Sequence, residues 1–307
     1  MKKILVATDK PFAKVAVDGI RKIVEDAGFT LALLEKYTSE DELLNAVADA
    51  DAMIVRSDIV NENVVNAASK LKIVVRAGAG YDNLDLKACS SKNIVAMNTP
   101  GQNSNAVAEL VFGMMVYAIR KQFNGAAGTE LRGKNIGIHA YGNVGYYVAK
   151  IAHGFGMNVY AFDPYVSDDK MKADNVQPVS SVEELYKTCQ FVSLHIPAND
   201  ATKKSINKNL LSLMPNGAVL VNTARKEVIN ETELVELMDE RSDFMYLSDI
   251  KPDNENVFAE KFSGRYLFTP KKMGAQTAEA NINAGMAAAT QIVNFFKTGD
   301  ETFRVNK

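Results

Sequence analysis

The stretch that decides the fold is NIGIHAYGNVGYYVAKIAHGFGMNVYAFDP, residues 135–164. Its first apolar run predicts a β-strand, and AYGNVG, residues 140–145, predicts a tight turn. The next residues have helical apolar spacing that stops at Gly154 and Gly156. A second strand, NVYAF, then leads to Asp163, 18 residues after Gly145. Strand, glycine turn, helix, strand and acid in this order indicate a dinucleotide-binding βαβ unit.

In such a unit, N–H groups at the helix N-terminus bind the pyrophosphate and the acid binds the ribose hydroxyls. The alternative is an ordinary tight turn, since Ala140 stands where the motif usually has its first glycine. We expect alanine to hold this turn only with a negative φ. The placement of Asp163 favours the nucleotide site. It also favours NAD over NADP, because a 2′-phosphate would meet a like charge and no arginine follows within Pro164-Tyr165-Val166.

Length and composition restrict the class of protein. A chain of 307 residues is long enough for two domains. With a net charge of −2 and 23% charged residues, it has no basic field for nucleic acid or an anionic membrane. The N-terminal apolar run is too short for a signal peptide, and no apolar stretch is long enough to span a bilayer. Cys89 and Cys189 lack metal-ligand spacing. We therefore expect a cytoplasmic protein without a metal site.

Residues 1–98 alternate short apolar strands with helical segments, which predicts a parallel sheet covered on both faces. The predicted strands are 3–8, 30–35, 52–56, 72–76 and 94–98. Ligands of such sheets bind beyond the carboxyl ends of the strands. Two of the predicted strands end in an arginine, Arg56 and Arg76. Each arginine alone could be a solvated strand end. Two at equivalent positions, one of them beside a glycine-rich loop, favour an anion pocket. The predicted substrate-binding residues are Arg56, Ser57, Arg76, Gly78, Ala79 and Gly80.

Thr99-Pro100-Gly101 predicts a hinge before a helix at residues 106–119 that is apolar nearly all round. Such a helix is either buried or lies at a subunit interface, and the polar segment 121–132 cannot cover it. We therefore predict a homodimer. A second α/β unit follows, with later strands at 191–195, 218–222, 245–250 and 266–270. A last helix, about residues 279–296, is expected to return to the first domain. The predicted fold is α/β with two doubly wound parallel-sheet domains, residues 1–99 with 277–307 and residues 100–276.

Four stretches together resemble the D-2-hydroxyacid dehydrogenase family over nearly the whole chain: RAGAGYDNLDL (76–86), NTPGQNSNAVAEL (98–110), AYGNVG (140–145) and VNTARKEVIN (221–230). Within that family the sequence is similar to the short D-3-phosphoglycerate dehydrogenases without a regulatory domain. The resemblance implies a Rossmann-like NAD-binding domain inserted in a flavodoxin-like substrate domain, and a homodimer built on the helix after Asn105.

The resemblance also implies NAD-dependent oxidation of D-3-phosphoglycerate to 3-phosphohydroxypyruvate and the reverse reduction, the first step of serine biosynthesis. Arg225 would hold the substrate's carboxylate and carbonyl, Asp249 would face the nicotinamide, and His195 would line the adenine pocket. The cofactor-binding residues expected from the motif and the resemblance are Tyr141, Gly142, Asn143, Val144, Gly145, Asp163, Pro164, His195, Pro197, Thr202, Thr223, Ala224, Asp249, Gly274 and Ala275.

The chain departs from the family at the acid/base. The family's histidine belongs two residues before Gly274-Ala275, where this chain has Lys272, and its orienting glutamate is replaced by Asn254. One interpretation is a non-catalytic, NAD-sensing protein. The other is a coordinated change, because imidazole needs a carboxylate to fix its tautomer whereas an ammonium needs none. We favour Lys272 as the acid/base, with the register against Lys271 left open.

Two classes of substrate are considered, a phosphorylated and an unphosphorylated 2-hydroxy acid. Arg225 alone can hold one carboxylate, so Arg56, Arg76 and the two lysines would be excess positive charge around a small acid. A phosphate on the substrate accounts for them. The alternative is an unphosphorylated 2-hydroxy acid such as glycerate, glyoxylate or lactate. His139 and His153 are expected to be packing or surface residues.

Overall fold

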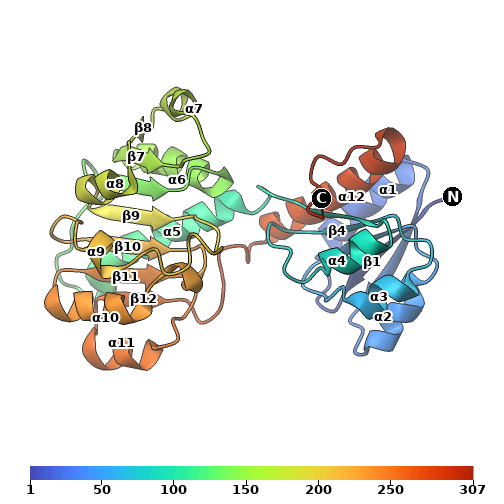
Figure 1. The fold of residues 1–307 in the computed structure, drawn as a ribbon, viewed down its shortest axis with the longest axis horizontal. Helices are drawn as coiled ribbons and strands as arrows, with labels where there is room; N and C mark the ends of the chain where they lie inside the picture. The colour runs from blue at the N-terminus through green and yellow to red at the C-terminus, as the bar shows by residue number, and fades with distance from the viewer. Residues whose placement is uncertain (307) are drawn as a thin grey trace. The chain divides into compact units, whose positions relative to one another are not determined.

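The computed structural model describes residues 1–306 and divides into two compact units. The first unit combines Met1–Asn103 with Gln276–Lys307, and the second is Ser104–Ala275. Each unit is built on its own parallel sheet with helices packed against it (Figure 1). The predicted class, α/β with two doubly wound parallel sheets, is confirmed.

Within the described residues, the first unit has a five-stranded sheet in the order β2-β1-β3-β4-β5. This is the flavodoxin-like order, and every strand pair in it is parallel. The carboxyl ends of all its strands therefore meet at one edge. The strands are β1 (Lys3–Thr8), β2 (Thr30–Glu35), β3 (Ala52–Val55), β4 (Ile73–Arg76) and β5 (Val95–Asn98).

Helices cover both faces of this sheet (Figure 1). One core lies between the sheet and the pair α1 and α12, and the other lies under α2, α3 and α4. The strands β1, β3, β4 and β5 are nearly continuous apolar runs because both of their sides are buried. The helices are α1 (Lys14–Asp26), α2 (Glu40–Val47), α3 (Glu62–Ala67), α4 (Leu86–Ser91) and α12 (Ala278–Thr298).

The second unit has a seven-stranded parallel sheet within the described residues, in the order β12-β11-β10-β9-β6-β7-β8. Strand order reverses at β6, which lies between β7 and β9, as in a Rossmann fold. The two-residue β8 was not predicted, because its length gives no periodic signal. The strands are β6 (Asn135–His139), β7 (Asn158–Phe162), β8 (Gln177–Pro178), β9 (Phe191–Leu194), β10 (Val219–Asn222), β11 (Met245–Ser248) and β12 (Tyr266–Phe268).

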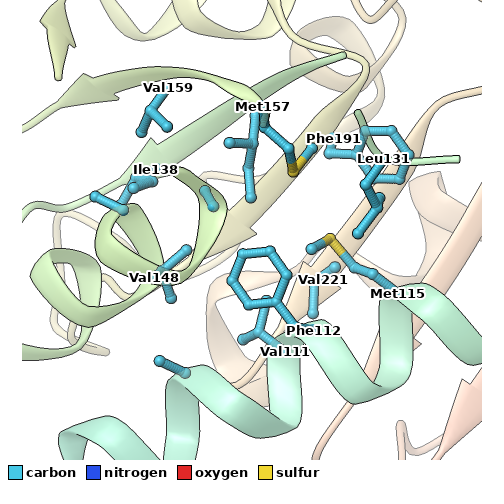
Figure 2. Packing of buried hydrophobic residues seen from close by; sticks show 14 of the residues in the cluster. Val111, Phe112, Met115, Leu131, Ile138, Val148, Met157, Val159, Phe191 and Val221 are labelled. Carbon is cyan, nitrogen blue, oxygen red and sulfur yellow. The ribbon is translucent and has the colours of Figure 1, made fainter. Parts of the chain in front are cut away.

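Two cores hold the second sheet. Figure 2 shows one of them, where Phe112 and Met115 lie with Val148 against strand residues such as Ile138 and Val221. The other core lies on the opposite side under α8, α9, α10 and α11. The helices are α5 (Ser104–Ile119), α6 (Asn143–Gly154), α7 (Asp168–Ala173), α8 (Val182–Thr188), α9 (Lys208–Leu211), α10 (Glu231–Glu240) and α11 (Glu255–Lys261), with short 3₁₀ turns η1 (Lys121–Phe123) and η2 (Lys226–Val228).

Helix α5 is buried on one side only. Val111, Phe112 and Met115 belong to the core, whereas Glu109 and Gly113 are exposed. The exposed positions of α5 are thus polar or glycine, and its apolar residues Leu110, Val116 and Tyr117 are half-buried.

Among residues 1–306, no helix combines the length and apolar character needed to cross a membrane. The same described residues contain no cluster of three or more His, Cys, Asp or Glu side chains arranged to hold a metal ion.

Candidate functional site

The turn between β6 and α6 has the geometry of an anion site. Helix α6 begins at Asn143, and its N-cap Gly142 is extended and provides no side-chain cap. The first N–H groups of the helix are therefore not satisfied by a capping side chain. A Cβ at Gly142 would have nothing within 4 Å, whereas a Cβ at Gly145 would lie 2.6 Å from the carbonyl oxygen of Ala140. Gly145 thus permits close packing, while Gly142 leaves space over the helix N-terminus.

The expectation for Ala140 was wrong. Its φ is +81°, in the left-handed region, and not negative. Its N–H donates to the carbonyl oxygen of Phe162 at 2.9 Å, which ties the turn to the end of β7. The position therefore has the conformation for which the motif usually uses glycine, and alanine holds it with strain.

Asp163 follows β7 and contacts the turn directly. One carboxylate oxygen accepts from the N–H of Tyr141 and the other from the N–H of Tyr165, both at 2.8 Å. Each oxygen has further lone pairs, so a ribose hydroxyl can still donate to it. Asp163 and Pro164 line a cavity of about 530 Å³ at the end of β7. Tyr141 itself is buried, and its hydroxyl donates to Asp174 at 3.0 Å, so its backbone rather than its ring faces the turn.

The residues after β9 form a second part of the predicted cofactor site. The N–H of His195 donates to the carbonyl oxygen of His139, and its Nε2 lies 3.0 Å from the Ser193 hydroxyl. Burial lowers the pKa of His195 to about 3, so the imidazole is neutral. Thr202 donates to the carbonyl oxygen of Pro197, which closes an exposed turn.

The loop after β10 is fixed by Asn222, a residue that the sequence analysis missed. Its buried side chain donates to the carbonyl oxygen of Arg225 at 3.0 Å and accepts from the N–H of Ala224 at 3.0 Å. The neighbouring Thr223 hydroxyl is buried and has no hydrogen-bond partner within the described residues. An unsatisfied buried hydroxyl at a strand's carboxyl end is suited to a ligand oxygen. The glycine turn and Thr223 together fit a dinucleotide.

Arg225 and Lys272 meet at one atom. The carbonyl oxygen of Ala224 accepts from Arg225 Nη1 at 3.0 Å and from Lys272 Nζ at 3.3 Å. The structure therefore brings the two residues predicted to be catalytic to the same point, although they lie 47 positions apart in the chain.

Asp249 holds the loop that carries Lys272. Its carboxylate is 1% exposed and accepts from the Thr269 hydroxyl at 2.9 Å and from the N–H groups of Met273 and Gly274 at 2.7 and 2.8 Å. A Cβ at Gly274 would lie 3.0 Å from this carboxylate. Asp249 was predicted to face the nicotinamide, and its carboxylate accepts hydrogen bonds from the 269–274 loop, which continues into Ala275.

Asn254, at the position of the family's glutamate, lies just before α11. Its amide oxygen is buried and has no hydrogen-bond partner among residues 1–306. Glu231 lies close by and accepts from the N–H of Asp253 at 2.9 Å, and burial raises the pKa of Glu231. No sequence motif pointed to Glu231, because it belongs to the first turn of a polar helix.

The predicted substrate residues of the first unit also form a connected set. Arg56 donates to the carbonyl oxygens of Lys10 and Pro11 and to Asn281 Oδ1, at 2.8, 3.1 and 2.7 Å. Arg76 Nε donates to the carbonyl oxygen of Arg56 at 3.0 Å. Arg56 and Arg76 are therefore neighbours, with the exposed Ser57 next to Arg56 in the chain.

The glycine loop after β4 leaves room for the Arg76 side chain. Gly78 has a φ of +152°, and a Cβ there would overlap the Arg76 guanidinium. Asn98 holds the loop by donating to the carbonyl oxygen of Ala79 at 2.6 Å, and Gly80 follows half-buried. The glycine is thus required by both its backbone and its neighbour.

Comparison with known proteins gives the class. Residues 105–262 match the model of the D-isomer specific 2-hydroxyacid dehydrogenase NAD binding domain. The chain belongs to the D-isomer specific 2-hydroxyacid dehydrogenase family, and its second unit carries the family's NAD-binding domain. The predicted family and the prediction of NAD as cofactor are both confirmed.

Individual relatives are more specific. The chain is similar to the NAD⁺-bound crystal structure of 3-phosphoglycerate dehydrogenase from Entamoeba histolytica, with 47% identity, a TM-score of 0.87 and coverage of 100% of this chain and 99% of that one. It is 35% identical to D-3-phosphoglycerate dehydrogenase of Methanocaldococcus jannaschii over 95% of this chain, and it spans 57% of that protein's length. It is also 30% identical to hydroxypyruvate reductase of Thermotoga maritima, over 85% of this chain and 90% of that protein.

Proposed function

We propose that this chain is an NAD-dependent dehydrogenase that oxidises D-3-phosphoglycerate to 3-phosphohydroxypyruvate and catalyses the reverse reduction. In that role it would act in the cytoplasm, in the first step of serine biosynthesis. The observation that carries the proposal is the convergence of Arg225 and Lys272 on the carbonyl oxygen of Ala224. A binding protein that only senses NAD has no need of a proton-transferring residue beside a carboxylate-binding guanidinium.

Bound NAD would supply the hydride acceptor for oxidation at C2 of the hydroxy acid, and NADH would supply the hydride donor for the reverse reduction. Arg225 binds the substrate's carboxylate and C2 oxygen with the planar fork of its guanidinium. Lys272 takes the proton from the C2 hydroxyl on oxidation and donates it to the keto oxygen on reduction. Asp249 and Asn222 hold the loops of these two residues. The cofactor should be NAD and not NADP, because a 2′-phosphate at Asp163 would face a carboxylate.

The first unit supports a phosphate on the substrate. The Arg56 guanidinium donates to the neutral oxygens of Lys10, Pro11 and Asn281, and the carboxylates of Asp9 and Asp58 act on it through space. Arg76 lies beside it, against the Arg56 carbonyl oxygen. Two adjacent guanidinium groups provide the planar N–H donors that bind a phosphate well.

The second candidate is reduction of an unphosphorylated keto acid, which the similarity to a hydroxypyruvate reductase favours. Purified full chain and NADH can be assayed with 3-phosphohydroxypyruvate, hydroxypyruvate and glyoxylate by the loss of nicotinamide absorbance. We expect kcat/KM for the phosphorylated acid to be at least about tenfold higher, a difference of about 1.4 kcal/mol. Equal values for the first two substrates would favour the second candidate, and no turnover of any would favour a non-catalytic protein.

Exposed aromatic side chains beside α5 and on or beside α6 support a homodimer. Phe123, just beyond this helix, is 65% exposed, and Phe155 is 41% exposed while its ring stacks on Phe112 at 5.1 Å. Tyr146, on α6, is 40% exposed. Exposed aromatic side chains gathered around two packed helices are typical of a protein interface.

A further inference from the structure

A buried carboxylate lies beside the proposed anion site and has no place in the reaction. Asp58 is 5% exposed and follows β3 by three residues. Its Oδ1 accepts from the Tyr37 hydroxyl and from the N–H of Asp9, both at 2.7 Å, and its Oδ2 accepts from the N–H of Arg56 at 3.2 Å. These donors come from the loops after β1, β2 and β3. One carboxylate therefore joins three strand ends at the edge of the sheet where ligands bind.

The backbone is strained at Lys36, the residue before Tyr37, where the chain turns towards this carboxylate. Lys36, which follows β2, has a φ of +57°, a conformation that costs an L-residue about 1–2 kcal/mol. Its N–H donates to the carbonyl oxygen of Thr8 at 3.1 Å, and the chain then turns so that Tyr37 reaches Asp58. Burial and the hydrogen bond to Asp58 raise the pKa of Tyr37, so its hydroxyl stays a donor.

Asp58 affects the positions of Arg56 and Arg76 through the Arg56 backbone. The N–H of Arg56 is held by Asp58, while its carbonyl oxygen accepts from Arg76 Nε at 3.0 Å and from Asn83 Nδ2 at 3.3 Å. Asn83 Nδ2 also donates to the Asp58 carbonyl oxygen at 2.7 Å. Movement of Asp58 would therefore displace both the Arg56 backbone and the contact that places Arg76.

We propose that Asp58, anchored by Tyr37, is a positioning residue that sets Arg56 and Arg76 as a pair for the substrate's phosphate. The inference rests on the proposed function, because it assumes that these two arginines bind that phosphate. Asp58 acts here on the Arg56 backbone, since its carboxylate oxygens accept from a hydroxyl and two backbone N–H groups while the Arg56 side chain bonds to Lys10, Pro11 and Asn281.

The test compares two carboxylates at opposite ends of one strand. Asp58→Asn keeps the shape of the side chain but turns an NH₂ group towards the N–H of Arg56. Asp51→Asn is the matched control, because Asp51 precedes β3 and also accepts a backbone N–H, that of Lys3, at 2.8 Å. We expect Asp58→Asn to raise KM for 3-phosphohydroxypyruvate about tenfold, the scale of one hydrogen bond to a charged group, with KM for NADH unchanged. Asp51→Asn should leave both KM values unchanged.

Tyr37→Phe keeps the test decisive if Asp58→Asn fails to fold, which thermal unfolding would reveal. It should raise the same KM in the same direction, by about threefold, since it removes one neutral donor. In both variants KM for unphosphorylated hydroxypyruvate should change less than KM for the phosphorylated acid. Equal changes for the two acids, or an equal effect of Asp51→Asn, would show a merely structural role, and an unchanged KM in both variants would also overturn the inference.

Failure of the proposed function is visible separately. If the wild-type protein shows no preference for the phosphorylated acid, the proposed substrate is wrong, and so is the proposed role of Asp58. This outcome is known before any variant is made. A wild-type preference that survives in Asp58→Asn and Tyr37→Phe defeats the role of Asp58 alone.

Discussion

At the scale of single residues, the two side chains proposed to be catalytic meet at the carbonyl oxygen of Ala224. It accepts from Arg225 and from Lys272, and the loops of these residues are held by Asn222 and Asp249. Lys271 and Lys272 are both exposed, but only the Lys272 side chain donates to the Ala224 carbonyl oxygen. This contact supports the register in which Lys272, not Lys271, is the acid/base.

Lys272→Met should lower kcat by about 10²-fold or more, the usual scale for loss of a general acid/base, while NADH binding stays near wild type. The measurement is steady-state turnover of the keto acid together with NADH titration by fluorescence. Lys271→Met is the control and should keep most of its turnover. The reverse outcome would show that the register is wrong, and activity in both variants would mean that the proton moves by another route.

At the scale of elements, the turn between β6 and α6 uses its two glycines, Gly142 and Gly145, for different reasons. Gly145 is needed for packing against Ala140, whereas a Cβ at Gly142 would have no atom of residues 1–306 within 4 Å. The φ of Gly142 is −86°, which alanine can adopt. A substitution there tests the cofactor site without testing the fold.

Gly142→Ala should weaken NADH binding at least about tenfold while the free energy of unfolding changes by less than about 1 kcal/mol. The added methyl group would lie where the pyrophosphate approaches the helix N-terminus. Calorimetric titration with NADH and urea unfolding measure the two quantities. Gly145→Ala, the contrast variant, should lose stability as well, because its Cβ would lie 2.6 Å from a backbone oxygen. Unchanged NADH affinity in Gly142→Ala would place the pyrophosphate elsewhere.

At the scale of the whole molecule, two half-buried histidines, His139 and His195, link stability to pH. Burial lowers the pKa of His139 to about 4 and that of His195 to about 3, from an ordinary value of 6.5. The unfolded chain binds these protons as the pH falls through 6.5, and the folded chain does not. Their stabilising contribution is therefore complete above pH 6.5 and is lost as the pH falls towards the folded pKa values.

The free energy of unfolding should thus decrease between pH 6.5 and 5, by at most about 1.4 kcal/mol per pH unit for each histidine. Urea unfolding at several pH values in this range measures the slope, before most carboxylates titrate. His195→Gln should reduce the slope, because one of the two protons is no longer taken up. A stability that is flat over this range would contradict the burial of both imidazoles as neutral groups.

Exposed aromatic side chains of the second unit predict a dimer. The chain should sediment as a dimer at micromolar concentration, because the exposed side chains of Phe123, Tyr146 and Phe155 would otherwise face water. Phe123→Lys should shift the protein towards monomer. Val15→Lys is the control, since Val15 is also 65% exposed but lies on α1 in the first unit. A wild-type monomer, or equal effects of the two variants, would refute the proposed interface.

The sequence by itself determined the class of fold, the family and the cofactor of this protein. Uninterrupted apolar strands need a cover on both faces, which predicts parallel sheets, and a glycine turn followed by Asp163 has a local geometry that spacing alone reveals. The strands were predicted to within one or two residues for the same reason, except β8, which is too short to show a period. Ala140 was mistaken because the conformation of a turn residue depends on the bonds that the finished turn makes.

Only the tertiary structure decided which distant residues share a site. Asp58, Tyr37 and Glu231 carry no motif, and the motif that contains Asn222 does not show its role. A polar side chain of this kind is recognised by the donors and acceptors around it, and these come from separate loops. The meeting of Arg225 with Lys272 at Ala224 has the same origin. Parallel strands bring their carboxyl ends to one edge, and the strand order that places particular loops side by side there is set by the packing of the whole sheet.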